Sequence, residues 1–170
     1  MPERPSAPPA PQAPGVTRPP EGADLDPAAL AEIGRRFIGA IPWAQALGME
    51  VLRIGRGEAV MRVAWDPRLV GDPATGVIHG GVLTALLDSC CGAAVMSHPD
   101  GPISTATIDL RIDYMRAARP GTAVLARAEC YRAGRSVAFV RAVAYEDDEA
   151  DPVATVAAAF ASQGRKEGRR

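Results

Sequence analysis

Residues 76–96 have the sequence GVIHGGVLTALLDSCCGAAVM, a glycine-rich turn followed by a long apolar run. Apolar side chains on nearly every face of such a run are typical of a helix that is buried in the protein core. One acid, Asp88, interrupts the run, and an ionised carboxylate in a buried helix is destabilising unless a neighbouring group compensates it. The segment therefore predicts a central core helix in which Asp88 has a functional role.

The start of this helix offers hydrogen-bond donors. The first N–H groups of a helix have no acceptor within the helix, and the helix dipole adds partial positive charge there. Gly80 and Gly81 carry no side chains that block approach, so a substrate carbonyl oxygen can bind against their amides, as in the oxyanion hole of acyl transfer. A tight turn with a purely structural role would also explain these residues, and the residues alone leave both interpretations open.

The distance between Gly80 and Asp88 limits how the two can act together. They are eight positions apart in the sequence, which is about 12 Å along a helix axis. Acid–base or nucleophilic chemistry on a carbonyl held at Gly80 requires contact within about 3 Å. One helix cannot bring both groups to one atom, whereas Asp88 of one subunit can face Gly80 of another. An active site built from these residues therefore lies at a homodimer interface.

The segments on either side of the central run predict one short helix and a set of strands. Residues 25–41 carry apolar side chains at helical spacing, and Pro42 is expected to end that helix. Residues 49–54 and 59–65 alternate with a period of two and predict a hairpin. Residues 66–75 are expected to form a loop. Four later segments alternate in the same way, namely residues 105–115, 122–132, 135–145 and 152–162.

The segment 105–115 predicts a strand with one apolar and one polar face. The apolar face is expected to consist of Ala106, Ile108, Leu110, Ile112 and Tyr114, and the polar face of Thr105, Thr107, Asp109, Arg111 and Asp113. Strands that surround one hydrophobic helix indicate an α+β domain, with an antiparallel sheet curled about that helix. This domain is expected to span residues 25–163. Residues 1–24, which hold eight of the sixteen prolines, predict a disordered leader, and residues 164–170 predict a flexible basic tail.

Composition excludes several classes of function. The formal net charge of −1 offers no basic footprint for nucleic acid. The apolar run approaches the length of a membrane span, but Asp88 at its centre favours the core of a soluble protein. The N-terminus has no apolar signal region. The three cysteines lack metal-ligand spacing, and their use as small core residues favours a metal-free protein in the cytoplasm.

The run from Gly76 to Asp88, with the later segments 108–110, 114–116 and 120–121, resembles the hotdog-fold acyl-CoA thioesterases of the phenylacetic-acid-degradation (PaaI-like) type. The similarity covers about residues 25 to 162. It implies the hotdog fold, in which a curled antiparallel sheet wraps one long central helix. It also implies homodimers that often pair into tetramers, with active sites between subunits. The implied reaction is hydrolysis of an acyl-CoA thioester to free acid and CoA, without a metal or other cofactor.

The resemblance also implies roles for single residues. Gly80 would donate its backbone N–H to the thioester oxygen, and Asp88 of the partner subunit would act as general base or nucleophile. His79 would orient the turn or contact the substrate. Thr107 stands where the family often has a hydroxyl residue that helps to hold the attacking water. Because CoA is highly anionic, arginines that flank the turns after the motif strands are candidates for its phosphates. These are Arg116, Arg119, Arg132 and Arg135.

One departure from the family pattern leaves a second function open. Relatives commonly carry Asn or Gln six or seven residues before the histidine, where this chain has Asp72 and Pro73. An ionised Asp72 can accept a hydrogen bond from water but cannot donate one to a carbonyl. A non-catalytic acyl-CoA-binding protein, acting as sensor or carrier, is therefore an alternative to the thioesterase, as is an interaction role through the proline-rich leader. The identity of the acyl group, and dimer against tetramer, are left open by these residues.

Overall fold

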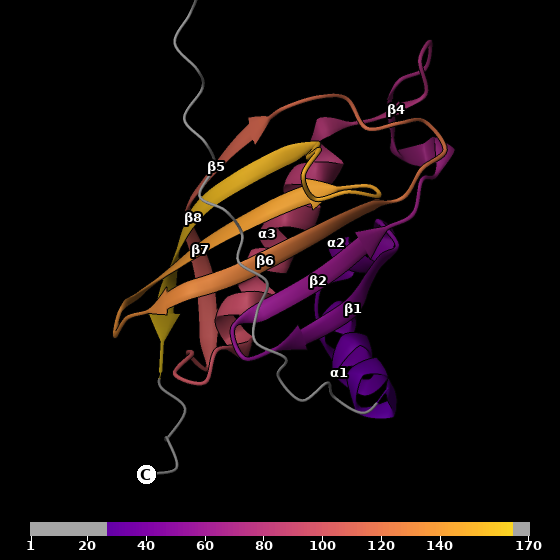
Figure 1. Ribbon diagram of the computed structural model, residues 1–170. Coiled ribbons are helices and arrows are strands. Elements are labelled where there is room, and N and C mark those ends of the chain that lie inside the picture. The colour runs from indigo at the N-terminus through magenta and orange to yellow at the C-terminus, as the bar shows by residue number, and fades with distance from the viewer. Residues whose placement is uncertain (1–26, 165–170) are drawn as a thin grey trace, which may run out of the picture.

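The computed structural model of the chain describes residues 27–164. The predicted disordered leader, and the predicted basic tail apart from Gly164, lie outside the described residues. Within the described range, one long helix, α3 (Gly80–Ser97), lies against a six-stranded antiparallel sheet (Figure 1). The spatial order of the strands is β1-β2-β6-β7-β8-β5. Their bounds are β1 Met49–Gly55, β2 Glu58–Val63, β5 Ser104–Tyr114, β6 Val124–Ala133, β7 Val137–Tyr145 and β8 Ala154–Gln163.

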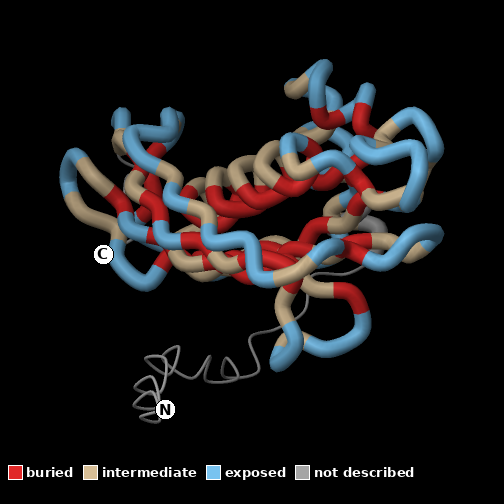
Figure 2. Tube along the Cα trace, turned by 90° about the horizontal axis from the view of Figure 1, so that it is seen from above, coloured by how far each residue is buried: buried red, intermediate tan, exposed pale blue. Residues whose placement is uncertain are grey.

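The hydrophobic core lies between α3 and the inner face of the sheet. Helix α3 contacts all six strands, and Figure 2 shows the buried positions concentrated between the central helix and the sheet. The inner face of β6 consists of Val124, Ala126, Ala128 and Cys130, small or branched residues that let the helix pack closely. The predicted α+β arrangement, an antiparallel sheet on one long central helix, is confirmed. The expected curling of the sheet around that helix stays a prediction.

Helix α3 is buried on one side only. Leu83, Leu86, Leu87 and Cys90 are among the residues that it buries against the sheet. The opposite side carries mostly small residues that border an open cleft: Thr84, Ala85, Asp88, Ser89, Gly92 and Met96. The expectation of a helix buried all round was therefore wrong for the single chain. Small residues such as alanine, glycine and serine occur both in the core and at the surface, so they did not distinguish the two sides of the helix.

The N-terminal segment forms two helices instead of one. Helix α1 (Pro27–Gly39) ends before Pro42, and Pro42 begins a second, short helix, α2 (Pro42–Ala46). Pro42 lies in the first turn of α2, where the N–H that proline lacks would have no helical partner. The prediction that the first helix ends before Pro42 is thus confirmed. The second helix, which begins at Pro42, was not predicted.

The segment 66–78 connects the hairpin β1–β2 to α3 and contains more structure than the expected loop. It forms a short 3₁₀ helix, η1 (Pro67–Leu69), and a two-stranded sheet of β3 (Val70–Asp72) and β4 (Val77–Ile78). The backbone N–H of His79 donates to the carbonyl of Leu69 at 2.8 Å. A Cβ at Gly71 would lie 2.8 Å from the Cα of His79, so only glycine fits here. This small sheet therefore holds the turn that starts α3.

A β-bulge in β5 changes which side chains face the helix. The register with β8 shifts between Thr107 and Asp109, so the side of the strand that faces α3 changes at Ile108. Thr107 therefore lies on the same side as Leu110 and Tyr114, and Ile108 is 59% exposed. The prediction of strict alternation, with Ile108 and Tyr114 on one face and Thr107 on the other, was wrong for this reason.

Candidate active site

A cleft of about 600 Å³ runs along the exposed side of α3. Helix α3, strand β5 and the α1–α2 segment form its walls, and Phe160 of β8 completes them. The residues that line it are Phe37, Ile41, Trp43, Gly81, Thr84, Ala85, Asp88, Ser89, Gly92, Met96, Thr105, Ala106, Thr107, Leu110 and Phe160. Most of this lining is apolar, and its few polar groups include one carboxylate. Such a volume and lining are typical of sites for small organic ligands.

Asp88 supplies the only carboxylate among the lining residues. Its Oδ1 accepts a hydrogen bond of 2.7 Å from the Thr107 hydroxyl. The two side chains meet because the bulge at Ile108 turns Thr107 toward α3. A threonine hydroxyl has one proton, which is donated to Asp88 here, so its lone pairs stay available as acceptors. Asp88 is half-buried and borders the cleft, which explains how this apolar helix carries an acid.

Some of the backbone N–H groups at the start of α3 have hydrogen-bond acceptors and one does not. The N–H of Gly81 donates to Nδ1 of His79 at 2.9 Å, and the N–H of Val82 donates to the carbonyl of His79. The N–H of His79 itself donates to Leu69. Among the residues that the structure describes, no acceptor is found for the N–H of Gly80. Of the two glycine amides predicted to bind a carbonyl, Gly80 therefore has the free donor, and Gly81 borders the cleft through its Cα.

His79 is the N-cap of α3. Its imidazole accepts the Gly81 N–H through Nδ1, which requires that Nδ1 carry no proton. A Cβ at Gly81 would lie 2.9 Å from this nitrogen, so the cap also requires glycine at that position. The arrangement is compatible with the predicted role of His79 in orienting the turn. Its other ring nitrogen has no hydrogen-bond partner within residues 27–164, so contact with a substrate also stays a prediction.

Substitutions of His79 can separate these two roles. His79→Ala is expected to lower the free energy of unfolding by about 1 kcal/mol, because it removes the acceptor at the N-cap. His79→Asn places an amide oxygen where Nδ1 lies and is expected to keep the native stability. Urea denaturation of both variants measures the difference. Equal destabilisation by the two variants would show that the cap contributes nothing.

Gly80 and Asp88 lie on one uninterrupted helix. Eight residues of α-helix separate them by about 12 Å along the axis. A thioester carbonyl bound at the N–H of Gly80 is therefore out of reach of Asp88 in the same chain.

Tyr114, at the end of β5, has contacts that the sequence did not indicate. Its hydroxyl donates to the carbonyl of Gly80 at 3.0 Å and lies 2.7 Å from the hydroxyl of Thr84. The Thr84 hydroxyl also lies 3.2 Å from that carbonyl, but it has one proton, which the 2.7 Å contact uses when the tyrosine proton goes to Gly80. The alternation of β5 predicted only an apolar position for Tyr114. The bulge is not visible in the alternating sequence pattern, so that pattern contains no signal for this contact.

Asp72 lies outside the cleft, as the last residue of β3 before the turn to β4. Its carboxylate accepts hydrogen bonds from the Thr75 hydroxyl at 2.7 Å and from the backbone N–H of Ala74 at 3.0 Å. These bonds, that of Thr75 first, lower the pKa of Asp72 below its ordinary value. Asp72 is therefore an ionised acceptor engaged with its own turn, and its contact with substrate stays a prediction.

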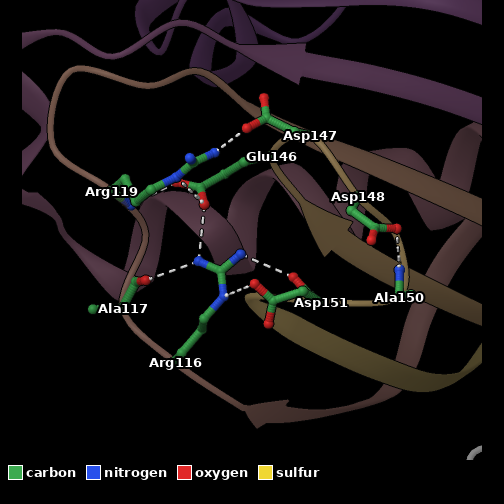
Figure 3. A network of polar contacts seen from close by, with 8 residues as sticks. All are labelled: Arg116, Ala117, Arg119, Glu146, Asp147, Asp148, Ala150 and Asp151. Carbon is green, nitrogen blue, oxygen red and sulfur yellow. Dashed lines mark hydrogen bonds and ion pairs between the residues drawn. The ribbon is translucent and has the colours of Figure 1, made fainter.

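The two arginines nearest the end of β5 pair with acids (Figure 3). Arg116 bonds to Glu146 at 2.8 Å and to the Asp151 carboxylate at 3.1 Å. Arg119 bonds to the same Glu146 at 3.0 Å and to Asp147. The side chain of Glu146 is fully buried between them. These ion pairs fasten the segment after β5 to the segment between β7 and β8.

None of the four candidate arginines lines the cleft of the single chain. Arg132 and Arg135 are exposed near the connection of β6 and β7. The role of these arginines toward CoA phosphates stays a prediction.

The cysteines are unsuited to nucleophilic chemistry. Cys90, Cys91 and Cys130 are free and buried. Burial raises the pKa of the Cys90 thiol to about 12, so it is protonated at neutral pH. Within residues 27–164, no three histidine, cysteine, aspartate or glutamate side chains lie close enough to hold a metal ion.

Helix α3 is long and apolar enough to cross a membrane, but half of it is buried inside the fold, so it is the core helix of a soluble protein.

Three comparisons with known proteins bear on this site. The family model "Thioesterase superfamily" matches residues 75–153. The medium/long-chain acyl-CoA thioesterase YigI of Salmonella typhimurium is 32% identical over 136 residues, which cover 71% of this chain and 86% of that protein. The Escherichia coli K12 protein of the same name matches equally well.

Solved structures agree with these matches. A Pseudomonas aeruginosa protein is 40% identical with a TM-score of 0.69, and the match covers 79% of this chain and 99% of that chain. A mutant of the phenylacetic acid degradation protein PaaI from Thermus thermophilus is 29% identical with a TM-score of 0.63, covering 71% and 98%. The predicted resemblance to hotdog thioesterases is thereby confirmed. This chain belongs to the thioesterase superfamily.

Proposed function

We propose that this thioester hydrolase acts on acyl-CoA at sites formed between two copies of the chain. One observation carries the proposal. The free N–H of Gly80 and the Asp88–Thr107 pair lie on one helix, about 12 Å apart. Neither group alone can both polarise a thioester and activate water. Two copies of α3 that lie side by side in opposite directions would bring Asp88 of one chain to Gly80 of the other, twice in each dimer.

The proposed reaction is a direct hydrolysis. A water molecule donates one hydrogen bond to Asp88 and one to the free lone pairs of Thr107, and it attacks the thioester carbon as Asp88 takes its proton. The oxygen of the tetrahedral intermediate accepts the N–H of Gly80 of the partner subunit, at the positive end of that helix. The carbon–sulfur bond then breaks, and the thiolate of CoA takes the proton from Asp88. The free acid and CoA leave the cleft.

The exposed edge of the sheet supports assembly of two chains. Strand β5 is the edge strand, and one side of it has no partner strand within residues 27–164. Ile108 and Met115 are about 60% exposed there. An unpaired strand edge with exposed apolar residues favours association with another chain, because both features are unfavourable in water. The occupant we propose is a second copy of this chain, since the site is incomplete without one.

The walls of the cleft support a medium or long acyl group. Phe37, Ile41 and Trp43 on one side and Leu110 and Phe160 on the other offer an apolar path beside Asp88. The two YigI proteins are named medium/long-chain acyl-CoA thioesterases, in agreement with this path. Release of free thiol from a panel of acyl-CoA esters of increasing length measures the preference. The location that we propose is the cytoplasm.

The Gly80 amide can be tested by deleting it. Gly80→Pro removes this N–H at the first helical position, where proline is best tolerated. The preceding residue, His79, already has extended backbone angles compatible with a following proline (φ −62°, ψ 134°). We expect kcat to fall by about 10²- to 10³-fold, the usual effect of losing one oxyanion donor.

Gly80→Ala is the matched variant, because it adds a Cβ and keeps the N–H. That Cβ would lie 3.5 Å from the Tyr114 hydroxyl, an ordinary contact. The ratio of kcat between the alanine and proline variants therefore measures the amide itself. Equal rates in two folded variants, checked by circular dichroism, would rule out Gly80 as the oxyanion donor.

The hydrogen bonds and the ionisation of Asp72 are compatible with the alternative function, a protein that binds acyl-CoA without hydrolysing it. Its carboxylate bonds to its own turn and, being ionised, cannot donate to a thioester carbonyl. A sensor or carrier would bind acyl-CoA and leave it intact. Acyl-CoA that co-purifies with the protein and releases no thiol on incubation would favour this alternative over the thioesterase.

A further inference from the structure

We propose that Tyr114 is a positioning residue, which holds the Gly80 peptide so that its free N–H is aimed at the thioester oxygen. This inference rests on the proposed function of Gly80. Tyr114 lies at the C-terminal end of β5 and Gly80 at the first position of α3. They are joined by the 3.0 Å hydrogen bond from the tyrosine hydroxyl to the glycine carbonyl.

Gly80 needs such support because it is a glycine. The N–H of Gly80 lies in the peptide plane that it shares with the His79 carbonyl, and this plane can tilt unless the Cα atoms at both of its ends are held. A residue without Cβ populates a wide range of backbone angles, so the Cα of Gly80 is held only if the next peptide plane is also fixed. The plane before Gly80 is held by the bond from Val82 N–H to the His79 carbonyl, 2.9 Å. The plane after it is held at its N–H end by the imidazole of His79. Its carbonyl end is held by the Tyr114 hydroxyl, and the Thr84 hydroxyl can donate its own proton to the tyrosine oxygen at 2.7 Å.

These contacts fix the direction of the Gly80 N–H, which has no acceptor within residues 27–164. The donor is thus oriented before the substrate arrives, and no reorganisation is needed when negative charge develops on the oxygen. Thr84 belongs to α3 itself, whereas Tyr114 links the Gly80 carbonyl to strand β5. The end of β5 is itself held in place, because the N–H of Met115, the residue after Tyr114, donates to the Val153 carbonyl at 2.9 Å.

The bulge at Ile108 is what makes the contact possible. Thr107 and Tyr114 are seven positions apart, and in a regular strand an odd separation places two side chains on opposite faces. The bulge inserts one residue between them, so both hydroxyls face α3. Strand β5 therefore holds both functional ends of the helix, Asp88 through Thr107 and Gly80 through Tyr114.

Tyr114→Phe tests the inference, because it removes only the hydroxyl. We expect kcat for acyl-CoA hydrolysis to fall about tenfold, while KM and Tm stay close to those of the unmodified protein. Tyr131→Phe is the matched control. Tyr131 is similarly exposed, and its ring lies beside Phe139 and Arg141, away from the cleft. An unchanged kcat in Tyr114→Phe would overturn the proposal.

A double variant shows whether Tyr114 acts through Gly80. In the Gly80→Pro background no N–H remains to be aimed, so adding Tyr114→Phe should leave kcat unchanged. A further tenfold loss in that background would overturn the proposal by showing that Tyr114 acts elsewhere. Full activity of Gly80→Pro alone would instead refute the proposed function.

A readout without turnover completes the test. In protein labelled with ¹⁵N, the amide resonance of Gly80 should shift in Tyr114→Phe and not in Tyr131→Phe. An unmoved resonance in both variants would contradict the role of the hydroxyl, even if Gly80→Pro failed to fold.

Discussion

Replacing Asp88 with asparagine is expected to lower kcat for acyl-CoA hydrolysis by about 10²- to 10⁴-fold, the range for loss of a general base. An amide cannot take a proton from water, yet it matches the carboxylate in size and still offers an oxygen to the Thr107 hydroxyl. The fold should therefore persist, with little change in Tm. Thiol release under saturating acyl-CoA, with circular dichroism on the same samples, measures both quantities.

Asp100→Asn is a suitable control for this experiment. Asp100 is an exposed carboxylate just beyond the C-terminal end of α3, and its substitution removes the same charge far from the cleft. It should leave kcat unchanged. A folded Asp88→Asn protein with full turnover would exclude Asp88 as the base.

Mixing two inactive variants shows whether the site is shared between chains. In a dimer of one Asp88→Asn chain and one Gly80→Pro chain, one site carries both substitutions and the other carries none. Random pairing makes half of the dimers mixed, each with one intact site, so about a quarter of the original activity should return. A site contained within one chain would regain nothing on mixing.

The second large effect is expected on stability. Glu146→Gln should lower the free energy of unfolding by about 1.5–3 kcal/mol, the usual contribution of hydrogen bonds to a charged group. The Glu146 side chain is fully buried and accepts bonds from both Arg116 and Arg119 (Figure 3). Glutamine would leave both guanidiniums facing a neutral group. For a protein of this size, Tm should fall by roughly 5 °C.

Asp147→Asn provides the comparison on the same network. Asp147 also pairs with Arg119, but its side chain is 75% exposed. Exposed pairs contribute about 0–1 kcal/mol, so this variant should unfold close to the original midpoint. Similar midpoints for the two variants in urea would show that the burial of Glu146 has no energetic consequence.

The same carboxylate is expected to make stability depend on pH. Burial by itself raises the pKa of Glu146, but the backbone N–H of Arg119 and the guanidiniums of Arg116 and Arg119 outweigh it, and the net pKa lies below the ordinary value. A lowered pKa in the folded state stabilises the fold at pH values above the unfolded-state pKa of glutamate, about 4.3. This contribution is lost as the pH falls through the lowered pKa, and Glu146→Gln should abolish that part of the acid dependence.

Several elements of this protein could be predicted from the sequence because their signals are local. The apolar run predicted α3, and the period of two predicted the strands to within a few residues. The separation of Gly80 from Asp88 follows from the rise of a helix and needs no tertiary information. The proposal that Asp88 and Gly80 act from different subunits therefore starts from the sequence alone.

Other features depend on contacts between distant parts of the chain. The pairing of Arg116 and Arg119 with Glu146 joins residues about thirty positions apart, and no periodic pattern records it. The two-stranded sheet that supports His79 is local, but its strands of three and two residues are too short to show a period of two. The short helix that begins at Pro42 was not predicted, because proline occurs both after one helix and at the start of the next.

The sequence by itself determined the central helix, its acid and its glycine turn, because hydrophobic period and helix geometry are properties of a short segment. Only the tertiary structure decided which side chains complete them. The bulge at Ile108 arises from the register between β5 and β8, and it turns Thr107 toward Asp88 and Tyr114 toward Gly80. Register is set by pairing with a strand some fifty residues away, so an alternating pattern read along one strand cannot contain it.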